Sequence, residues 1–293
     1  MDITWLPDAR RRERHVAVGE FDGVHIGHRE VIRGADTVLT FEPHPRYVVA
    51  PDSAPKLLTP LAVKADLIAG LGVQELVVIP FDGSFAAQSA QEFIDRELVE
   101  RLGARTVSVG ENFRFGHKAK GDTELLRAQD AFTTRVAQLV EVEGEIVSST
   151  HIRGLVSAGE VAAAARFLAA PFQMRGTVAH GDKRGRTLGF PTANLVPDSA
   201  LVVPDHGIYA CLAEVGGERR IAAVNVGVRP TFQTGRGLLV EAFLLDFDGD
   251  IYGQELRLDF LERLRGEKRF ESVDALVEQM HRDVEVARRV AAV

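Results

Sequence analysis

Apolar residues in the first half of the chain fall into short runs, separated by longer segments in which they recur every three or four positions. The short runs predict buried strands, and the longer segments predict amphipathic helices. Strands that alternate with helices form a mostly parallel sheet with both faces covered. We therefore expect a Rossmann-like α/β domain with strands at 15–18, 37–41, 76–79 and 106–109, and with helices at 29–34, 59–70 and 90–102.

The pattern changes near Pro171, where strand-like runs begin to follow one another with Gly and Pro between them. Several short strands joined by turns predict a small antiparallel β-barrel. The last segment, from Val273 to Ala287, has apolar residues at three- and four-residue steps, which predicts a terminal helix with one packing face. We expect two domains, over 1–170 and 171–293. The barrel strands are expected at 173–179, 209–215, 221–226, 238–247 and 256–260.

Charge argues against a nucleic-acid partner. The 293 residues include 35 Lys and Arg against 42 Asp and Glu, a net charge of −7. An acidic chain repels a phosphate backbone. The basic run at Arg10, Arg11, Arg12 and Arg14 is therefore interpreted as a solvated arm or turn. The length suits two domains, and the 45% of hydrophobic residues suffices for two packed cores.

The chain has one cysteine, Cys211, so it forms no internal disulfide, as is usual in a reducing compartment. Cys211 lies in an apolar run and is expected to be a buried structural thiol. The charged first residues do not resemble a signal peptide, and no apolar run approaches the roughly 20 residues that span a bilayer. We expect a cytoplasmic protein without a membrane partner. The sequence leaves the oligomeric state open.

The first candidate site is the string G-E-F-D-G-V-H-I-G-H at 19–28, which follows a predicted strand and precedes a helix. Ligands of open parallel sheets bind at the carboxyl ends of strands, and a helix start offers free N–H groups to phosphate. Gly27 allows a close approach, and His25 and His28 could donate hydrogen bonds to phosphate oxygens. Two loop histidines alone are more often surface side chains. A zinc site is disfavoured because no Cys or carboxylate lies at ligand spacing.

The second candidate site is the string G-D-K-R-G-R-T-L-G-F-P-T-A-N at 181–194. Its glycines allow a loop that wraps phosphate, and its basic residues supply positive charge. Thr192 and Asn194 are two residues apart, so in an extended segment both side chains point to the same face. Oxygen donors of this kind suit Mg²⁺. A Gly-rich turn before an ordinary strand is the competing interpretation. The expected phosphate contacts are Gly181, Lys183, Gly185, Arg186, Thr187 and Gly189.

H-x-G-H after a first strand resembles the first signature of nucleotidylyltransferases, and S-S-T-H-I-R at 148–153 resembles the second. With T-F-E-P-H-P at 40–45 and V-G-E-N-F-R-F-G at 109–116 between them, the four strings resemble the N-terminal module of bacterial FAD synthetases. Neither G-x-x-x-x-G-K-[ST] nor G-x-G-x-x-G is present, so the use of ATP is inferred from these strings alone. The resemblance implies His25, His28 and Arg153 as catalytic residues and Asn112 as a flavin contact. It implies nucleotide contacts at Gly19, Phe21, Asp22, Gly27, Ser148, Ser149 and Thr150.

The second string resembles the riboflavin kinase signature with its P-T-A-N core. The resemblance continues through N-V-G-V-R-P-T-F at 225–232 and V-E-A-F-L-L-D at 240–246, and on to R-L-R at 263–265 and K-R-F at 268–270. It implies Glu241 as general base, which takes the proton of the riboflavin 5′-hydroxyl. It also implies flavin contacts at Phe190, Arg229 and Arg265. Without the resemblance, Glu241 would be interpreted as a solvated strand residue.

Together the strings identify the chain as a member of the bacterial bifunctional riboflavin kinase/FMN adenylyltransferase family. Such an enzyme uses ATP and Mg²⁺ to phosphorylate riboflavin to FMN, then adenylylates FMN to FAD, so its partners are small-molecule substrates. The chain departs from the family at Glu20, where Asn is usual, at Asn112 within G-E-N-F, and in a short first helix. Two alternatives remain: one active module beside a degenerate one, with the adenylyltransferase more at risk, or a non-catalytic flavin or nucleotide sensor.

Overall fold

A computed structural model of the chain describes residues 1–179, 190–231 and 235–292, without the side chains of 228–231 and 235–237. The chain divides into two compact units, Met1–Ser149 and Thr150–Val293. The sequence placed the boundary at residue 170. The structure instead groups the helices α7 (Ser149–Ser157) and α8 (Val161–Leu168), apart from Ser149 itself, with the second unit.

The first unit contains a six-stranded sheet in the order β1-β4-β3-β2-β5-β6, and every neighbouring pair is parallel. The four predicted strands are its centre. The two edge strands were missed because their side chains are largely exposed or half-exposed and give no apolar run. The strands are β1 (Asp2–Trp5), β2 (Arg14–Val18), β3 (Thr37–Glu42), β4 (Glu75–Pro80), β5 (Ala104–Gly110) and β6 (Thr133–Ala137), followed by the short pair β7 (Glu141–Val142) and β8 (Glu145–Ile146).

Short helices connect these strands. The first begins at Ile26, three residues before the predicted start, and is only seven residues long, in line with the expected short first helix. The α-helices are α1 (Ile26–Ile32), α2 (Arg46–Val49), α3 (Leu61–Ala69), α4 (Gly83–Ala86), α5 (Ala90–Glu92) and α6 (Thr123–Arg127). A π-helix, Phe93–Arg101, continues α5, and 3-10 turns lie at Leu6–Asp8, Pro51–Ser53 and His117–Ala119.

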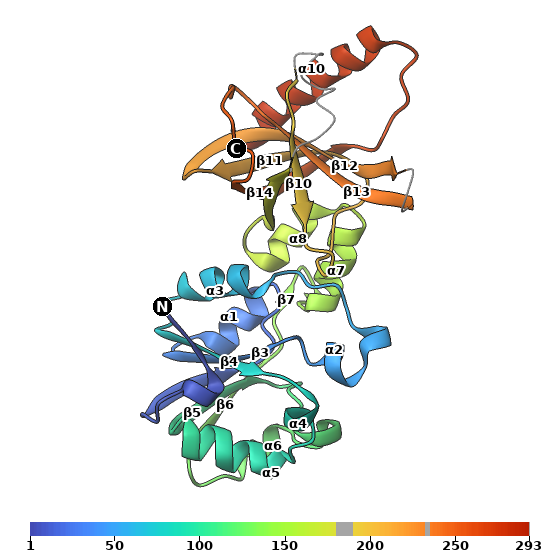
Figure 1. The fold of residues 1–293 in the computed structure, drawn as a ribbon. Coiled ribbons are helices and arrows are strands. Elements are labelled where there is room, and N and C mark those ends of the chain that lie inside the picture. Colours follow the sequence, from blue (N-terminus) through green and yellow to red (C-terminus); the bar gives the residue numbers. More distant parts are fainter. Residues whose placement is uncertain (180–189, 232–234, 293) are drawn as a thin grey trace. The chain divides into compact units, whose positions relative to one another are not determined.

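Two apolar cores cover the two faces of the sheet. Successive side chains of a strand point to opposite faces, so Val16 and Val18 of β2 join one core while Ala17 joins the other. The helices α1 and α3 cover one face, and α5 and α6 lie on the other (Figure 1). This two-sided burial explains why the strands are continuous apolar runs.

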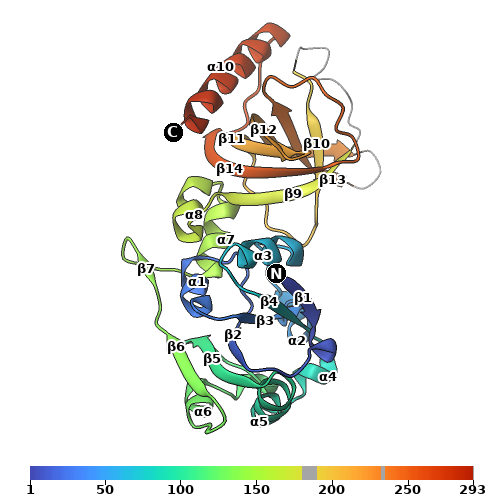
Figure 2. The same cartoon turned by 90° about the vertical axis from the view of Figure 1, so that its left-hand side faces the viewer.

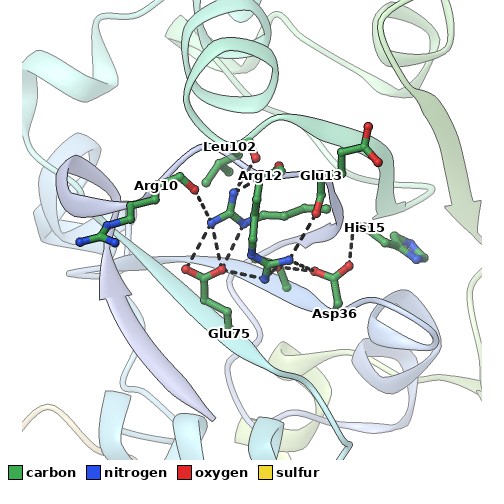
Figure 3. A network of polar contacts seen from close by, with 9 residues as sticks. Arg10, Arg12, Glu13, His15, Asp36, Glu75 and Leu102 are labelled. Atoms are coloured by element: carbon green, nitrogen blue, oxygen red, sulfur yellow. Dashed lines mark hydrogen bonds and ion pairs between the residues drawn. The ribbon is translucent and has the colours of Figure 1, made fainter.

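The basic run near the first residues is only in part a solvated arm. Arg10, Arg11 and Arg12 are exposed, but Arg14 begins β2 and is 3% exposed. Its guanidinium donates to Glu75 Oε2 at 3.1 Å and to the Leu102 carbonyl at 2.6 Å. Arg12 also donates to Glu75 Oε2, at 2.9 Å (Figure 3). The prediction of a solvated residue is therefore wrong for Arg14. The buried Arg14 guanidinium pairs with the Glu75 carboxylate, and this pair holds the amino-terminal ends of β2 and β4 in place.

Replacing Arg14 by Met is expected to destabilise the first unit by about 3 kcal/mol, the lower end for a broken buried ion pair, because Arg12 still reaches Glu75 at 2.9 Å. The chain's single tryptophan is Trp5 on β1, so its fluorescence during urea unfolding reports on this unit. The control is Arg105→Met, which breaks an exposed pair with Glu13 and should cost at most about 1 kcal/mol. Equal costs for the two variants would contradict the structural role of Arg14.

The second unit contains a closed antiparallel barrel in the order β10-β13-β12-β11-β14-β9. The helix α10 (Val273–Ala291) packs against β11, β12 and β14 of the barrel, and α8 packs against β14 and β9 (Figure 2). The predicted fold class, an α/β domain followed by a small barrel and a terminal helix, is confirmed. The barrel strands are β9 (Phe172–Ala179), β10 (Ala193–Pro197), β11 (Gly207–Val215), β12 (Glu218–Thr231), β13 (Gly235–Leu244) and β14 (Glu255–Arg265).

The thiol of Cys211 lies inside this barrel, fully buried on β11, as the apolar run predicted. Burial raises its pKa well above the usual value. Because thiol reagents attack the exposed thiolate, we expect no labelling by dithiobis-nitrobenzoate at pH 8 in the folded chain and one equivalent in urea. Rapid labelling of the folded protein would contradict this placement.

Candidate functional sites

The first candidate site is the turn between β2 and α1. His25 is the N-cap of α1, and its Nδ1 accepts a hydrogen bond from the His28 backbone N–H at 3.2 Å. A neutral His25 therefore carries its proton on Nε2, where it can donate to a ligand. The two imidazole rings are stacked, with their centroids 3.5 Å apart. A Cβ on Gly27 would lie 3.3 Å from the His25 ring, so glycine permits this packing.

The residues before His25 form a buried turn. Phe21 is 1% exposed, and its ring meets His28 edge-on with centroids 5.3 Å apart. A Cβ on Gly19 would lie 3.0 Å from the same ring. Asp22 is 2% exposed, and its carboxylate accepts hydrogen bonds from the backbone N–H groups of Leu58 and Thr59. The structure thus brings the first-signature residues together, with the Asp22 carboxylate directed at the segment that precedes α3.

The start of α3 differs from the predicted start at residue 59. The helix begins at Leu61 with Pro60 in the N-cap position, and Thr59 lies before it. The Thr59 hydroxyl accepts from the Gly23 N–H at 3.0 Å. Gly23 lies 36 residues away in the sequence, so no local pattern could have identified this contact.

The second signature begins beside this turn. Ser149 Oγ donates to the Asp22 carbonyl at 2.9 Å, and Ser148 precedes it in the same unit. Thr150 and Arg153 follow on α7, which is assigned to the second unit. The predicted roles of these four residues toward ATP stay predictions.

A cavity of about 860 Å³ lies at the carboxyl ends of β3, β4 and β5. Asn112 and Glu20 are among the polar residues that line it. Its walls are aromatic, which suits a flat ring system. The aromatic lining consists of Phe41, Phe81, Phe85, Phe93, Phe113 and Phe115.

A buried lysine was missed by the sequence analysis. Lys64 of α3 is 5% exposed, and its Nζ donates to Thr40 Oγ1 at 3.3 Å. Burial lowers the pKa of Lys64, and the carboxylates of Glu20, Asp22 and Glu42 offset this lowering only in part. The sequence around Lys64 does not indicate that this lysine is buried near carboxylates.

The second candidate site lies in the barrel, where three neighbouring strands bring polar residues into one row. Glu241 of β13 pairs with Asn194 of β10 on one side and with Asn225 of β12 on the other. Residues opposite one another in an antiparallel pair have their Cβ atoms about 4.5–5.5 Å apart. The row therefore places two amides beside the carboxylate. The segment that contains Asn194 was predicted only as extended chain.

A cavity of about 670 Å³ lies over this row. It contains four predicted site residues, and Phe190 packs edge-on against Phe243 with ring centroids 5.0 Å apart. Asn225 also lines it and was missed as a site residue, although it begins the string N-V-G-V-R-P-T-F. The predicted residues that line the cavity are Phe190, Thr192, Glu241 and Arg265.

Arg265 is held at the edge of the cavity by α10. Its Nε and Nη2 donate to Asp283, with Nη2 2.7 Å from Oδ2, and Asp283 is 6% exposed. Gln279, one turn earlier on α10, donates to the same carboxylate at 2.9 Å. Nε and Nη2 of Arg265 are therefore hydrogen-bonded within the protein. Nη1 donates to the Gly266 carbonyl.

Some predicted residues lie outside the described part of the chain: Gly181, Lys183, Gly185, Arg186, Thr187 and Gly189, together with the side chain of Arg229. In the residues that are described, no group of three or more His, Cys, Asp or Glu could hold a metal ion. Among the same residues, no helix combines the length and the hydrophobicity that spanning a bilayer requires.

Comparisons with known proteins match both halves of the chain. The FAD synthetase family model matches residues 8–151, and the riboflavin kinase family model matches residues 168–291. A solved structure described as a macrolide-efflux protein from Streptococcus pneumoniae has a TM-score of 0.89 and 32% identity, with 98% of this chain and 99% of that chain covered. Its name indicates transport, whereas the family models indicate flavin-cofactor synthesis. We follow the models because each accounts for one unit.

Relatives support the same conclusion along the whole chain. The protein of Bacillus subtilis named bifunctional riboflavin kinase/FMN adenylyltransferase is 37% identical, with 94% of this chain and 91% of that protein covered. The proteins of the same name from Pseudomonas fluorescens and Escherichia coli K12 are both 38% identical, with 94% and 93% of this chain covered. The chain belongs to the bifunctional riboflavin kinase/FMN adenylyltransferase family, with an FAD synthetase domain followed by a riboflavin kinase domain.

Proposed function

We propose that riboflavin is phosphorylated in the barrel cavity around Glu241 and that FMN is adenylylated around His25 and His28. The observation that carries this proposal is the assembly in the barrel. Residues from the four strands β11 to β14, from the segment before β10 and from α10 line one cavity, which contains a carboxylate, hydroxyl and amide oxygens and aromatic walls. Such a cavity has the size and mixed polarity of a small-molecule site.

In the kinase reaction, Glu241 would accept the proton of the riboflavin 5′-hydroxyl as its oxygen attacks the γ-phosphorus of ATP. ADP leaves and FMN forms. Asn225, opposite Glu241, is placed to orient the carboxylate or the hydroxyl by hydrogen bonding. Phe190 would contact the flavin ring, and we assign Arg265 and Arg229 to the same substrate.

Mg²⁺ is proposed at Thr192 and Asn194. Their side chains offer the hard oxygen donors that the ion takes, and two protein ligands suffice because Mg²⁺ keeps waters and substrate phosphates. The absence of an acidic metal cluster in the described residues is compatible with such a site. Bound there, the ion would neutralise charge on the phosphates of ATP.

In the adenylyl transfer, an oxygen of the FMN phosphate would attack the α-phosphorus of ATP and release pyrophosphate. His25 Nε2 and the His28 ring would donate to the phosphate oxygens as negative charge develops. Ser148, Ser149, Thr150 and Arg153 are proposed to hold the triphosphate. The aromatic cavity that contains Asn112 would receive the isoalloxazine ring of FMN.

Both activities are tested by incubating the chain with riboflavin, ATP and Mg²⁺ and separating the products by chromatography. FMN and FAD are the expected products. FMN alone would indicate a degenerate adenylyltransferase, the alternative to which Glu20 and the seven-residue α1 point. No product would indicate a sensor. The cytoplasmic location, the absence of nucleic-acid and membrane partners and the open oligomeric state stay predictions.

A further inference from the structure

The turn that precedes His25 has an unusual backbone. Three of its residues have positive φ angles: 52° at Phe21, 85° at Gly23 and 42° at Val24. Glycine adopts such angles freely, but a β-branched or bulky residue at positive φ is an outlier. Strain of this kind persists only where the surrounding structure holds it, and it gathers at functional sites.

The middle of the turn is held at Asp22 and Gly23. The Asp22 carboxylate accepts from the segment before α3, the Gly23 N–H donates to Thr59, and Ser149 donates to the Asp22 carbonyl. These contacts fix the middle of the turn. They leave the Glu20 carbonyl, where the chain departs from β2, to be held from another direction.

Thr40 and Lys64 hold that carbonyl. Thr40 Oγ1 donates to the Glu20 carbonyl at 3.1 Å, and Lys64 Nζ donates to Thr40 Oγ1 at 3.3 Å. A hydroxyl has one donor and two acceptor sites, so both bonds form together. Thr40 is 0% exposed and Lys64 is 5% exposed, so water does not compete for either bond. The hydroxyl direction is thereby fixed by the ammonium behind it.

Burying an ammonium group is unfavourable unless nearby charges compensate it. Lys64 has three carboxylates around it, those of Glu20, Asp22 and Glu42, and each favours its charged form. Two of the three belong to the turn itself. The carboxylates therefore offset part of the cost of burying the ammonium group that donates to the Thr40 hydroxyl.

We propose that Thr40 and Lys64 are positioning residues for adenylyl transfer, a buried relay that keeps the Glu20–Val24 turn in its strained form and so places His25 and His28. The proposal rests on the assignment of FAD formation to those two histidines. Neither relay residue needs to touch substrate. Thr40 acts through the Glu20 carbonyl, and Lys64 acts through Thr40.

The test uses the full chain and measures FAD formation from FMN and ATP. Thr40→Val keeps the shape and removes the hydroxyl, and Lys64→Met removes the ammonium. Each should lower kcat about 10- to 100-fold, as expected for misplaced catalytic groups. KM for FMN should stay within about threefold, because the phenylalanine walls of the cavity are not changed. The double variant should be no slower than the slower single variant, since both residues act in one relay.

Thr40→Ser keeps the hydroxyl and should retain a rate within about threefold of wild type. If Thr40→Val acted through altered packing instead, Thr40→Ser, which lacks the methyl group, would be impaired as well. Lys120→Met, at an exposed lysine of the same unit, is the matched control. If Thr40→Val does not fold, as judged by Trp5 fluorescence, Thr40→Ala takes its place in the comparison with Thr40→Ser. Loss of activity in Thr40→Ser equal to that in Thr40→Val or its Ala replacement overturns the relay.

The relay is also overturned if Thr40→Val or Lys64→Met forms FAD within about threefold of wild type while His28→Ala is strongly impaired, against the 10- to 100-fold loss expected of a displaced site. An unimpaired His28→Ala variant would instead remove the assigned role of the histidines. The two failures are therefore distinguishable. Riboflavin kinase activity of each preparation provides an internal standard and should not change.

Discussion

Glu241→Gln should slow the conversion of riboflavin to FMN by about 10²–10⁴-fold, the contribution typical of a positioned general base. The riboflavin hydroxyl is a weak nucleophile at neutral pH, and Gln keeps the shape of the side chain while it removes the proton acceptor. Glu241 lies on β13 with Asn194 and Asn225 opposite it, so the variant should retain the barrel register. Phosphoryl transfer also depends on positioning and metal electrostatics, which could bring the loss to the lower end.

The comparison for Glu241 is made on one preparation. FMN-to-FAD conversion should be unchanged, because it relies on the other unit, and ATP binding to the kinase should be nearly intact. Glu255→Gln removes an exposed carboxylate from β14 of the same barrel and is the matched control. An FMN-forming rate within about threefold of wild type, against the expected 10²–10⁴, would remove Glu241 from the catalytic residues and leave Thr192, Asn194 and Mg²⁺ as the main contributors.

His28→Ala should reduce FAD formation from supplied FMN by about 10²–10³-fold, the usual loss when a donor to transition-state charge is removed. The His28 ring stacks on His25 and meets Phe21, so it is held before the substrate arrives. A held donor stabilises developing charge without reorganisation. FMN formation from riboflavin should continue at the wild-type rate, because it depends on the barrel.

The control for His28 is His15→Ala. His15 lies near the start of β2, at the opposite end of the strand from the turn that leads to His28, where its ring contacts Ser108 at 2.7 Å. Its loss should leave FAD formation nearly unchanged. If the His15 and His28 variants are equally impaired, the effect of His28 is structural, and if neither is impaired, the phosphate-donor role of His28 is wrong.

The sequence alone determined the fold class and the family. Continuous apolar runs identified the four central strands of the parallel sheet, because strands buried on both faces carry no alternation. Short strands between Gly and Pro turns identified the barrel. The motif strings are contiguous, so their resemblance to the family motifs predicts His25, His28, Thr192 and Glu241 as site residues.

Only the tertiary structure decided which separate segments meet. In the sequence, Arg14 looks like one more residue of a basic run. Its burial depends on its hydrogen bond to Glu75, which lies 61 positions away on β4. Asn225 joins Glu241 in the lining of one cavity because the two residues are paired across β12 and β13. Lys64 resembles any helix lysine until β3 places Thr40 beside it. Local apolar periodicity indicates which face of a strand or helix a residue lies on. Its partners on other strands and helices depend on long-range pairing and packing, which no local pattern shows.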